Sequence, residues 1–137
     1  MINAPLVYLL DTGVANRVAL DHQPTMNRLA RSQIIYVPHI VIGELTFGAY
    51  LYAHRNNSAK FLTLYDTFYT RYQQQIVTPD EDTARIYGAI YAELTAKGAL
   101  MQQNDVWIAA LARQYHWTLA TLDGDFTRIS NLAVELF

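Results

Sequence analysis

The sequence predicts an α/β protein in which a central, mostly parallel sheet is flanked by helices. Three observations support this prediction. Short, continuous apolar runs of strand length recur along the chain, as in strands that are buried on both faces of a sheet. Longer segments with helical spacing alternate with these runs. The 137 residues suit one domain and contain no repeat or Pro/Gly/Ser-rich linker, so we expect a single domain over residues 1–137.

The first half of the chain is predicted to form two strands and three helices. In order, these are a strand at residues 6–10, a short helix at 12–20, a strand at 33–37, a helix from 38 to about 54 and a helix at 58–75. Thr12 and Gly13 offer a helix start after the first strand. Pro38 suits the first turn of a helix, and the apolar residues that follow it recur at helical spacing.

The second half of the chain repeats this alternation. It is predicted to contain a strand at 76–77, a helix to residue 97, a helix to residue 115, a strand at 117–121, a tight turn at 123–125 and a last strand at 132–136. Thr78 or Asp80 would cap the first of these helices, and Gly98 would end it. Asn104 or Asp105 is expected to cap the second.

Composition and charge exclude several classes of protein. The absence of cysteine excludes a disulfide scaffold, a thiolate zinc site and a cysteine nucleophile. No apolar run approaches the roughly 18 residues of a membrane span, and the N-terminus has no basic region before its apolar stretch. We therefore expect a soluble, cytoplasmic protein without membrane association. Ten basic and twelve acidic residues are not the basic excess of a dedicated nucleic-acid binder, although eight of the ten are arginine.

Four acidic residues are predicted to converge on one edge of the sheet. Asp11 ends the first strand, and Asp123 follows the strand at 117–121. Glu44 lies in the first turns of the helix after the second strand, and Asp105 begins a later helix. Because sites in open α/β sheets form outside the carboxyl ends of the strands, these carboxylates would share one cleft.

Such a cluster of carboxylates needs compensation for its negative charge. Two carboxylates about 5 Å apart repel each other by roughly 3 kcal/mol at an effective dielectric near 20. The site therefore requires raised pKa values or a bound cation. Because the sequence offers only oxygen ligands here, the cation would be Mg²⁺ or Mn²⁺, and such an ion suits phosphodiester hydrolysis.

Simpler structural roles are available for most of these acids. Asp11 and Asp105 would serve as helix caps. Asp123 and Asp125 flank a glycine in a turn, where Asp is common. Only Glu44, which lies in an apolar setting, has no such explanation.

Four segments of the chain carry a family resemblance. They are Tyr8-Leu9-Leu10-Asp11-Thr12, the run from Val37 that ends in Glu44-Leu45-Thr46-Phe47-Gly48-Ala49, Asn104-Asp105-Val106-Trp107-Ile108-Ala109-Ala110, and Thr121-Leu122-Asp123-Gly124-Asp125-Phe126. In this order and at these distances they resemble the motifs of PIN-domain ribonucleases, in particular VapC-type toxins. The resemblance spans essentially the whole chain and implies a PIN-like three-layer fold.

The resemblance implies a Mg²⁺- or Mn²⁺-dependent endoribonuclease, the toxin of a type II toxin–antitoxin system. Its metal ligands and catalytic residues would be the four acids Asp11, Glu44, Asp105 and Asp123. A water that they position would attack the phosphodiester and leave 5′-phosphate and 3′-hydroxyl ends. The substrate would be RNA, either transfer or messenger RNA. The protein would be a homodimer, and a VapB-like antitoxin would contact the helical hairpin at about 38–75 and neutralise the toxin.

Two further sets of residues are predicted to support this site. Four polar residues would orient the carboxylates and the water by hydrogen bonds, namely Thr12, Asn104, Thr121 and Asp125. The last of these could also replace Asp123 as the fourth acid. Four arginines would flank the mouth of the site and contact RNA phosphates, namely Arg17, Arg28, Arg31 and Arg128.

One departure from the family pattern motivates an alternative. Gly13 stands where the family usually carries Asn or a similar polar residue, so the chain could be a PIN fold with weakened catalysis that acts as an RNA- or protein-binding module. A different α/β phosphotransfer fold would need a lysine near a strand terminus, and neither Lys60 nor Lys97 is so placed.

If the four acids form one site, eight acidic and ten basic residues remain in the rest of the chain, which predicts modest, salt-sensitive RNA affinity.

Overall fold

A five-stranded sheet forms the centre of the computed structural model, which describes residues 4–137. The strands are β1 (Val7–Leu10), β2 (Ile34–Pro38), β3 (Ile76–Val77), β4 (Thr118–Thr121) and β5 (Val134–Leu136), in the spatial order β3-β2-β1-β4-β5. All four pairings between them are parallel, which confirms the predicted sheet. As a result, the carboxyl ends of the strands meet at one edge. Residues 1–3, part of the segment in which no signal peptide is predicted, lie outside the described residues.

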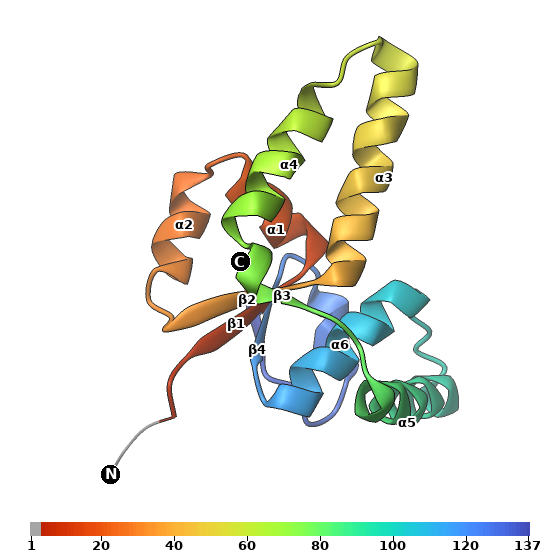
Figure 1. The fold of residues 1–137 in the computed structure, drawn as a ribbon. Helices are drawn as coiled ribbons and strands as arrows, with labels where there is room; N and C mark the ends of the chain where they lie inside the picture. Colours follow the sequence, from red (N-terminus) through yellow and green to blue (C-terminus); the bar gives the residue numbers. More distant parts are fainter. Residues whose placement is uncertain (1–3) are drawn as a thin grey trace.

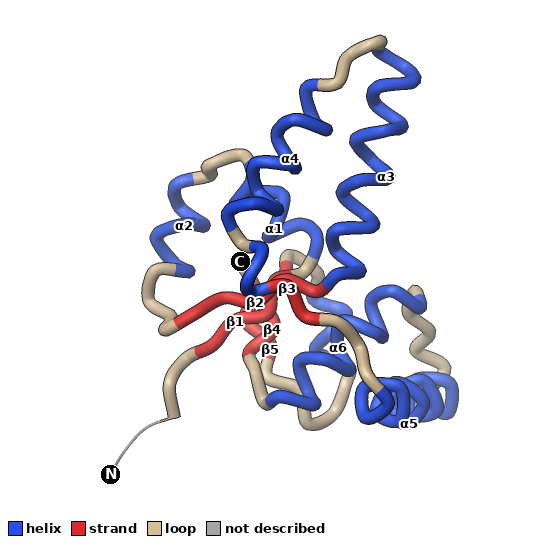
Figure 2. The backbone as a smooth tube through the Cα atoms, in the orientation of Figure 1, coloured by secondary structure: helices blue, strands red, loops and turns tan. Residues whose placement is uncertain are grey.

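Helices cover both faces of the sheet and give a three-layer α/β fold (Figure 1). They are α1 (Thr12–Ala19), α2 (Gln23–Leu29), α3 (His39–Asn56), α4 (Lys60–Arg71), α5 (Glu81–Lys97) and α6 (Gln103–Tyr115), with short 3₁₀ helices η1 (Gln73–Gln75) and η2 (Gly124–Arg128). Figure 2 shows α1–α4 on one side of the strands and α5 and α6 on the other. The α3–α4 hairpin projects from the body. Among the helices of residues 4–137, none has the length and the apolar character that a membrane span needs.

The central strands and α6 form the most deeply buried part of the core. Leu9 and Leu10 of β1 and Leu119 of β4 are fully inaccessible to solvent, as is the run Ile108–Ala112 of α6. Burying a side chain such as leucine contributes about 1.5–3 kcal/mol each. The residues that directly follow β1 and β4 are therefore attached to the most firmly held strands of the sheet.

Two helical segments differ from the prediction. Helix α2 is not predicted from the sequence, because its seven residues show no apolar periodicity and only Thr25 and Leu29 are buried. Its start is nevertheless marked by Pro24 in the first turn and by His22, whose ring accepts a hydrogen bond from the Thr25 amide. The helix predicted at 58–75 ends at Arg71 and continues only as η1.

The predicted helix ends are partly right. Asp80 caps α5 in a capping box with Thr83, and Gly98 ends that helix with φ +67°, a left-handed conformation that glycine adopts readily. The prediction that Asn104 or Asp105 caps α6 is wrong. That helix begins at Gln103, so both residues lie inside its first turn. The predicted turn at 123–125 is the start of η2.

Candidate active site

Asp11 lies at the carboxyl end of β1 and caps α1. Its Oδ1 accepts a hydrogen bond from the Thr12 amide at 2.8 Å, and its Oδ2 accepts one from the Thr121 hydroxyl at 2.7 Å. The residue is only 9% exposed. Burial raises the pKa of the Asp11 carboxyl, the two hydrogen bonds oppose this shift, and the charge of Asp123 adds to it. Asp11 is thus both a helix cap and a fixed, buried carboxylate, so the structural and functional explanations do not exclude each other.

Thr121 connects Asp11 to the segment that follows β4. Its hydroxyl is fully buried, donates to Asp11 Oδ2, and accepts a hydrogen bond from the Asp123 amide at 3.0 Å. Since both roles of the hydroxyl are used, its orientation is fixed. This is the geometry that the predicted orienting role of Thr121 requires.

Glu44 approaches Asp11 from the second turn of α3. The Thr12 hydroxyl donates to Glu44 Oε1 at 3.2 Å, while the Thr12 amide holds Asp11, so one residue orients two carboxylates. Burial raises the pKa of Glu44, the bond from Thr12 lowers it, and the negative charge of Asp11 raises it further. The apolar surroundings predicted for Glu44 are Val41 and Leu45, both buried on the same helix.

Asp105 contributes a carboxylate from α6, which lies on the side of the sheet opposite α3. It is half-buried in the first turn of α6, where the helix dipole favours an anion by about 0.3–1 kcal/mol. Burial, followed by the charges of Asp11, Glu44, Asp123 and Asp125, nevertheless raises the pKa of Asp105 to about 6. Within residues 4–137, no donor forms a hydrogen bond with this carboxyl. Asp105 therefore carries the least compensated negative charge of the group.

Asp123 and Asp125 differ in how they relate to this group. Both are exposed, and Asp123 Oδ1 caps η2 by accepting from the Asp125 amide at 2.9 Å. The backbone of Asp123 is tied to Thr121, and its charge acts on Asp11. The carboxylate of Asp125 instead pairs with Arg128 at 3.3 Å. The geometry thus favours Asp123 as the fourth acid. Below, "the acid cluster" means Asp11, Glu44, Asp105 and Asp123.

The donor set fits a hard divalent cation. All the candidate ligands are carboxylate oxygens, and the pKa values of Asp11, Glu44 and Asp105 are raised in part by mutual repulsion. Within the described residues, no three acidic or histidine side chains lie close enough to ligate one ion together. Mg²⁺, however, is usually held by one or two carboxylates and keeps several waters, so a three-carboxylate cage is not required.

The four predicted RNA-binding arginines lie in three different places. Arg28 and Arg31 meet at Glu135 Oε2, at 2.8 and 3.0 Å, and not at the acid cluster. Arg28 also stacks over the ring of Phe137. Arg17 lies in the last turn of α1, and Arg128 pairs with Asp125 as described above. RNA contact by these residues stays a prediction.

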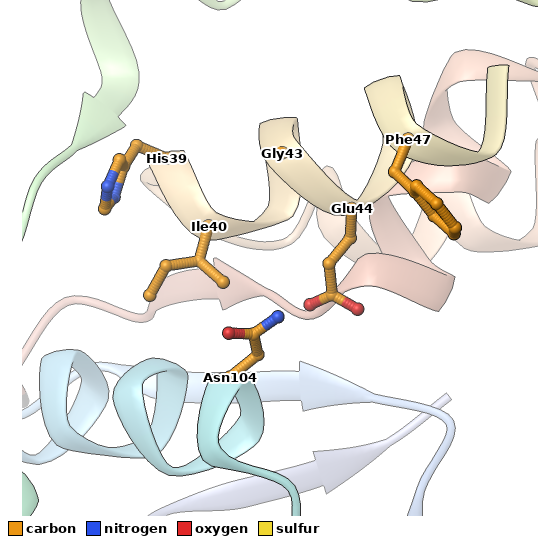
Figure 3. A pocket seen from close by; sticks show the side chains of 6 residues that line it. All are labelled: His39, Ile40, Gly43, Glu44, Phe47 and Asn104. Carbon is orange, nitrogen blue, oxygen red and sulfur yellow. The ribbon is translucent and has the colours of Figure 1, made fainter. Parts of the chain in front are cut away.

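A groove between α3 and α6 borders the acid cluster at Glu44 (Figure 3). Its volume is about 490 Å³, and it is lined by His39, Ile40, Gly43, Glu44, Phe47 and Asn104, which we call the α3–α6 groove. Asn104, predicted to orient a carboxylate, faces this groove. The other four were not predicted, although Ile40 and Phe47 are four and three residues from Glu44 and therefore share its side of the helix.

Fold and site together define an α/β protein with an acidic site at the carboxyl edge of a parallel sheet. The family model of the PIN domain matches residues 8–132, so the chain belongs to the PIN-domain family. It is 28% identical to Ribonuclease VapC2 of Rickettsia felis over 95% of this chain and 97% of that protein. It is 24% identical to Ribonuclease VapC5 of Mycobacterium tuberculosis, over 97% and 95%.

Solved structures agree with the assignment to this family. The crystal structure of VapBC2 from Rickettsia felis bound to a DNA fragment from its promoter superposes with a TM-score of 0.82 at 26% identity, over 96% of this chain and 99% of that one. FitAcB from Neisseria gonorrhoeae gives a TM-score of 0.76 at 29% identity, over 93% and 95%. The predicted PIN-like fold is confirmed.

Proposed function

We propose that this protein is a Mg²⁺- or Mn²⁺-dependent endoribonuclease and the toxin of a toxin–antitoxin pair. The observation that carries the proposal is the acid cluster: carboxylates from four separate segments gather at the carboxyl edge of the sheet with their charge uncompensated. The relatives named as ribonucleases support RNA as the substrate. The fit of the oxygen donors to a hard cation supports the metal dependence.

Each residue of the cluster has a distinct task in this proposal. Asp11 and Asp105 would hold the cation directly, Asp11 in an orientation fixed by Thr12 and Thr121. Glu44 and Asp123 would complete the set or bind through water. A bound cation lowers the pKa of a water ligand and offsets charge on a phosphate. The groove beside Glu44 provides the space in which an RNA chain can lie.

The similarity to the solved structures of VapBC2 and FitAcB supports an antitoxin partner for this chain. The α3–α4 hairpin is the predicted contact. Among the aromatic side chains of this hairpin, Tyr65 and Phe68 are buried in the core, whereas Phe47 and Tyr50 on α3 are 68% and 54% exposed. We propose that Tyr50, which lies outside the α3–α6 groove, belongs to the antitoxin-facing surface. A homodimer, a single domain over residues 1–137 and a cytoplasmic location remain part of the proposal.

The alternative of a weakened binding module rests on Gly13. A Cβ atom at this position would lie 3.0 Å from Leu122 Cδ1, so close packing offers a reason for the glycine that is independent of catalysis. The hydrogen bonds beside Gly13 are intact: the Thr12 amide and the Thr121 hydroxyl donate to Asp11, and the Thr12 hydroxyl donates to Glu44. These observations favour the nuclease over the binding module.

The direct test is cleavage of a mixed-sequence, single-stranded RNA with Mg²⁺ or Mn²⁺, with and without EDTA. Asp11→Asn and Asp105→Asn should remove cleavage, because each deletes a charge that holds the cation. Asp66→Asn, a neutralisation of an exposed acid on α4, is the matched control and should cleave like the wild type. Equal activity in all four proteins, or full activity in EDTA, would contradict the proposal.

A further inference from the structure

The α3–α6 groove continues past the acid cluster along α3. A second hollow of about 320 Å³ shares His39, Ile40 and Asn104 with it and extends to Pro79 and Trp107. The two hollows therefore adjoin each other, and together they extend from Phe47 past Glu44 to Pro79 and Trp107. Each lies within the range of volumes that binds small organic groups. A ligand held at the acids would have one neighbouring portion lying in this groove.

The lining of the groove combines flat apolar surface with exposed polar groups. The ring of Phe47 is 68% exposed and Ile40 is half-buried. Asn104 and His39 are both exposed beside them, and Figure 3 shows Asn104 opposite Ile40 and Glu44 across the gap. The amide of Asn104 offers both donors and an acceptor. Aromatic faces for stacking together with hydrogen-bonding groups for a base edge are the features by which proteins bind single-stranded RNA.

Gly43 keeps the groove open in the middle. It lies on the groove side of α3, and an added Cβ atom would meet no described atom within 4 Å. Neither packing nor backbone conformation requires glycine here, since Gly43 lies inside a helix with no positive φ. Glycine inside a helix costs about 0.5–1 kcal/mol relative to alanine. The glycine leaves free the space beside Glu44 that a larger side chain would occupy.

We propose that the α3–α6 groove is a nucleobase subsite that holds the base next to the scissile phosphate. Phe47 provides the stacking face, Asn104 contacts the base edge, and Gly43 leaves the room that the base occupies. The inference rests on the proposed nuclease function and deepens it, because it assigns the residues that select the nucleotide at the cleavage site.

The test begins by mapping where the wild-type protein cleaves a mixed-sequence RNA. The mapped site is then used in three oligonucleotides: one with all bases, one abasic on the 5′ side of the scissile phosphate and one abasic on the 3′ side. Phe47→Ala should lower kcat/KM on the complete RNA by about fivefold to a hundredfold, mainly through KM, as expected for loss of one base stack. On one of the two abasic RNAs, wild type and Phe47→Ala should cleave equally well.

Two matched controls separate a lost subsite from a damaged fold. Leu100→Ala removes another large apolar side chain that is also 68% exposed but lies outside the groove, and it should behave like the wild type. Gly43→Leu should narrow the groove and change the base preference at the cleavage site while retaining or raising thermal stability. Gly48→Leu, at a helical glycine of α3 that also has no described atom near its Cβ position, should raise stability without that change.

The failures of the two proposals are distinguishable. If the wild-type protein cleaves no RNA under any metal condition, both the nuclease and its base subsite are refuted. If it cleaves, but Phe47→Ala loses the same factor on all three RNAs or Gly43→Leu keeps the wild-type base preference, only the subsite is overturned. The groove would then be free for a peptide ligand.

Discussion

Two groups of charged side chains lie on different parts of the sheet, and they are built on opposite principles. In the Glu135 cluster, which comprises Tyr8, Arg28, Arg31 and Glu135, the carboxylate accepts hydrogen bonds from the Tyr8 hydroxyl at 2.7 and 2.8 Å and ion-pairs with both guanidinium groups. In the acid cluster, neighbouring negative charges raise the pKa of Asp11, Glu44 and Asp105, and no cationic side chain of the described residues pairs with the four. The first group is complete within the chain, whereas the second has no positively charged partner among the described residues.

Under the proposed function, this difference separates charge that stabilises the fold from charge that serves the active site. Tyr8 is fully buried, and through Glu135 it connects β1 to β5 and to the end of α2. That network stabilises the protein as it stands. Asp105 and its neighbours instead destabilise the protein without a cation, because burial and, after it, the approach of like charges raise their pKa values. Proteins retain such uncompensated acids where function requires them.

The largest expected effect is on RNA cleavage, and it is the most direct test of whether the two clusters differ in function. Asp11→Asn should lower RNA cleavage by about a thousandfold or more, since metal-held charge contributes several kcal/mol to the transition state. Glu135→Gln also neutralises a partly buried carboxylate, yet its cleavage rate per folded molecule should stay close to wild type. Initial rates at equal folded concentration provide the measurement. A similar loss in both variants would show that the two clusters are not functionally distinct.

The next largest effect is on the free energy of unfolding, and here the Glu135 cluster is expected to matter. Glu135→Gln should lower the free energy of unfolding by about 1–3 kcal/mol, because the Tyr8 hydroxyl and two guanidinium groups lose a charged acceptor. Urea unfolding monitored by circular dichroism would measure this change. Glu81→Gln, which breaks only the exposed pair with Arg85, is the control and should cost well under 1 kcal/mol. A neutral effect of Glu135→Gln would mean that this network does not hold β5.

A smaller effect, an increase in the free energy of unfolding, is expected when Asp105 is neutralised. Its pKa is raised from 3.8 to about 6 in the folded protein, so the folded form binds more protons and stability falls as pH rises between about 4 and 6. The shift corresponds to at most about 3 kcal/mol, and solvent screening at a half-exposed carboxyl reduces this to about 1–2 kcal/mol.

Asp105→Asn should therefore stabilise the metal-free protein by about 1–2 kcal/mol at pH 7.5 and by almost nothing at pH 4. Unfolding in EDTA at the two pH values measures both numbers. Millimolar Mg²⁺ should raise the midpoint of thermal unfolding of the wild type more than that of the variant. A variant that is less stable than wild type at pH 7.5 would contradict the proposed destabilisation by the buried Asp105 charge.

The smallest effect concerns Gly13, beside the acid cluster. Gly13→Ala removes the helix cost of glycine but brings a Cβ atom to 3.0 Å from Leu122, so the two effects should nearly cancel within about 1 kcal/mol. In a Leu122→Ala background the same change should stabilise by about 0.5–1 kcal/mol. Cleavage should be unaffected in either background. A large loss of cleavage with unchanged stability would indicate a catalytic reason for the glycine.

Much of the architecture could be read from apolar patterns. Continuous apolar runs predict β1, β2 and β4, because strands buried on both faces have no polar alternation. The capping residue Asp80 and the terminating Gly98 mark α5, because both act locally. Helix α2 was missed because its stability depends on tertiary burial of only two residues. The cap of α6 was wrong because Asn and Asp fit a first turn as well as a cap.

The acids of the candidate site follow from the sequence, since their positions after strands and within motifs do not depend on side-chain packing. Their surroundings do depend on it. The placement of Arg28 and Arg31 at Glu135, more than a hundred residues along the chain, leaves no local signal. The α3–α6 groove joins residues from two layers, and only the packing of one layer against the other creates it.

The sequence by itself determined the fold class, the alternation of strands and helices and the identity of the acids at the strand ends. Apolar periodicity and residue type act over short distances along the chain, and parallel pairing then directs all the strand ends to one edge. Only the tertiary structure decided which charges are compensated. In the folded protein, Glu135 pairs with two arginines, whereas the acid cluster has no cationic partner among the described residues and lies beside an open groove. Pairing of charges depends on distances in space, and no local sequence pattern encodes those distances.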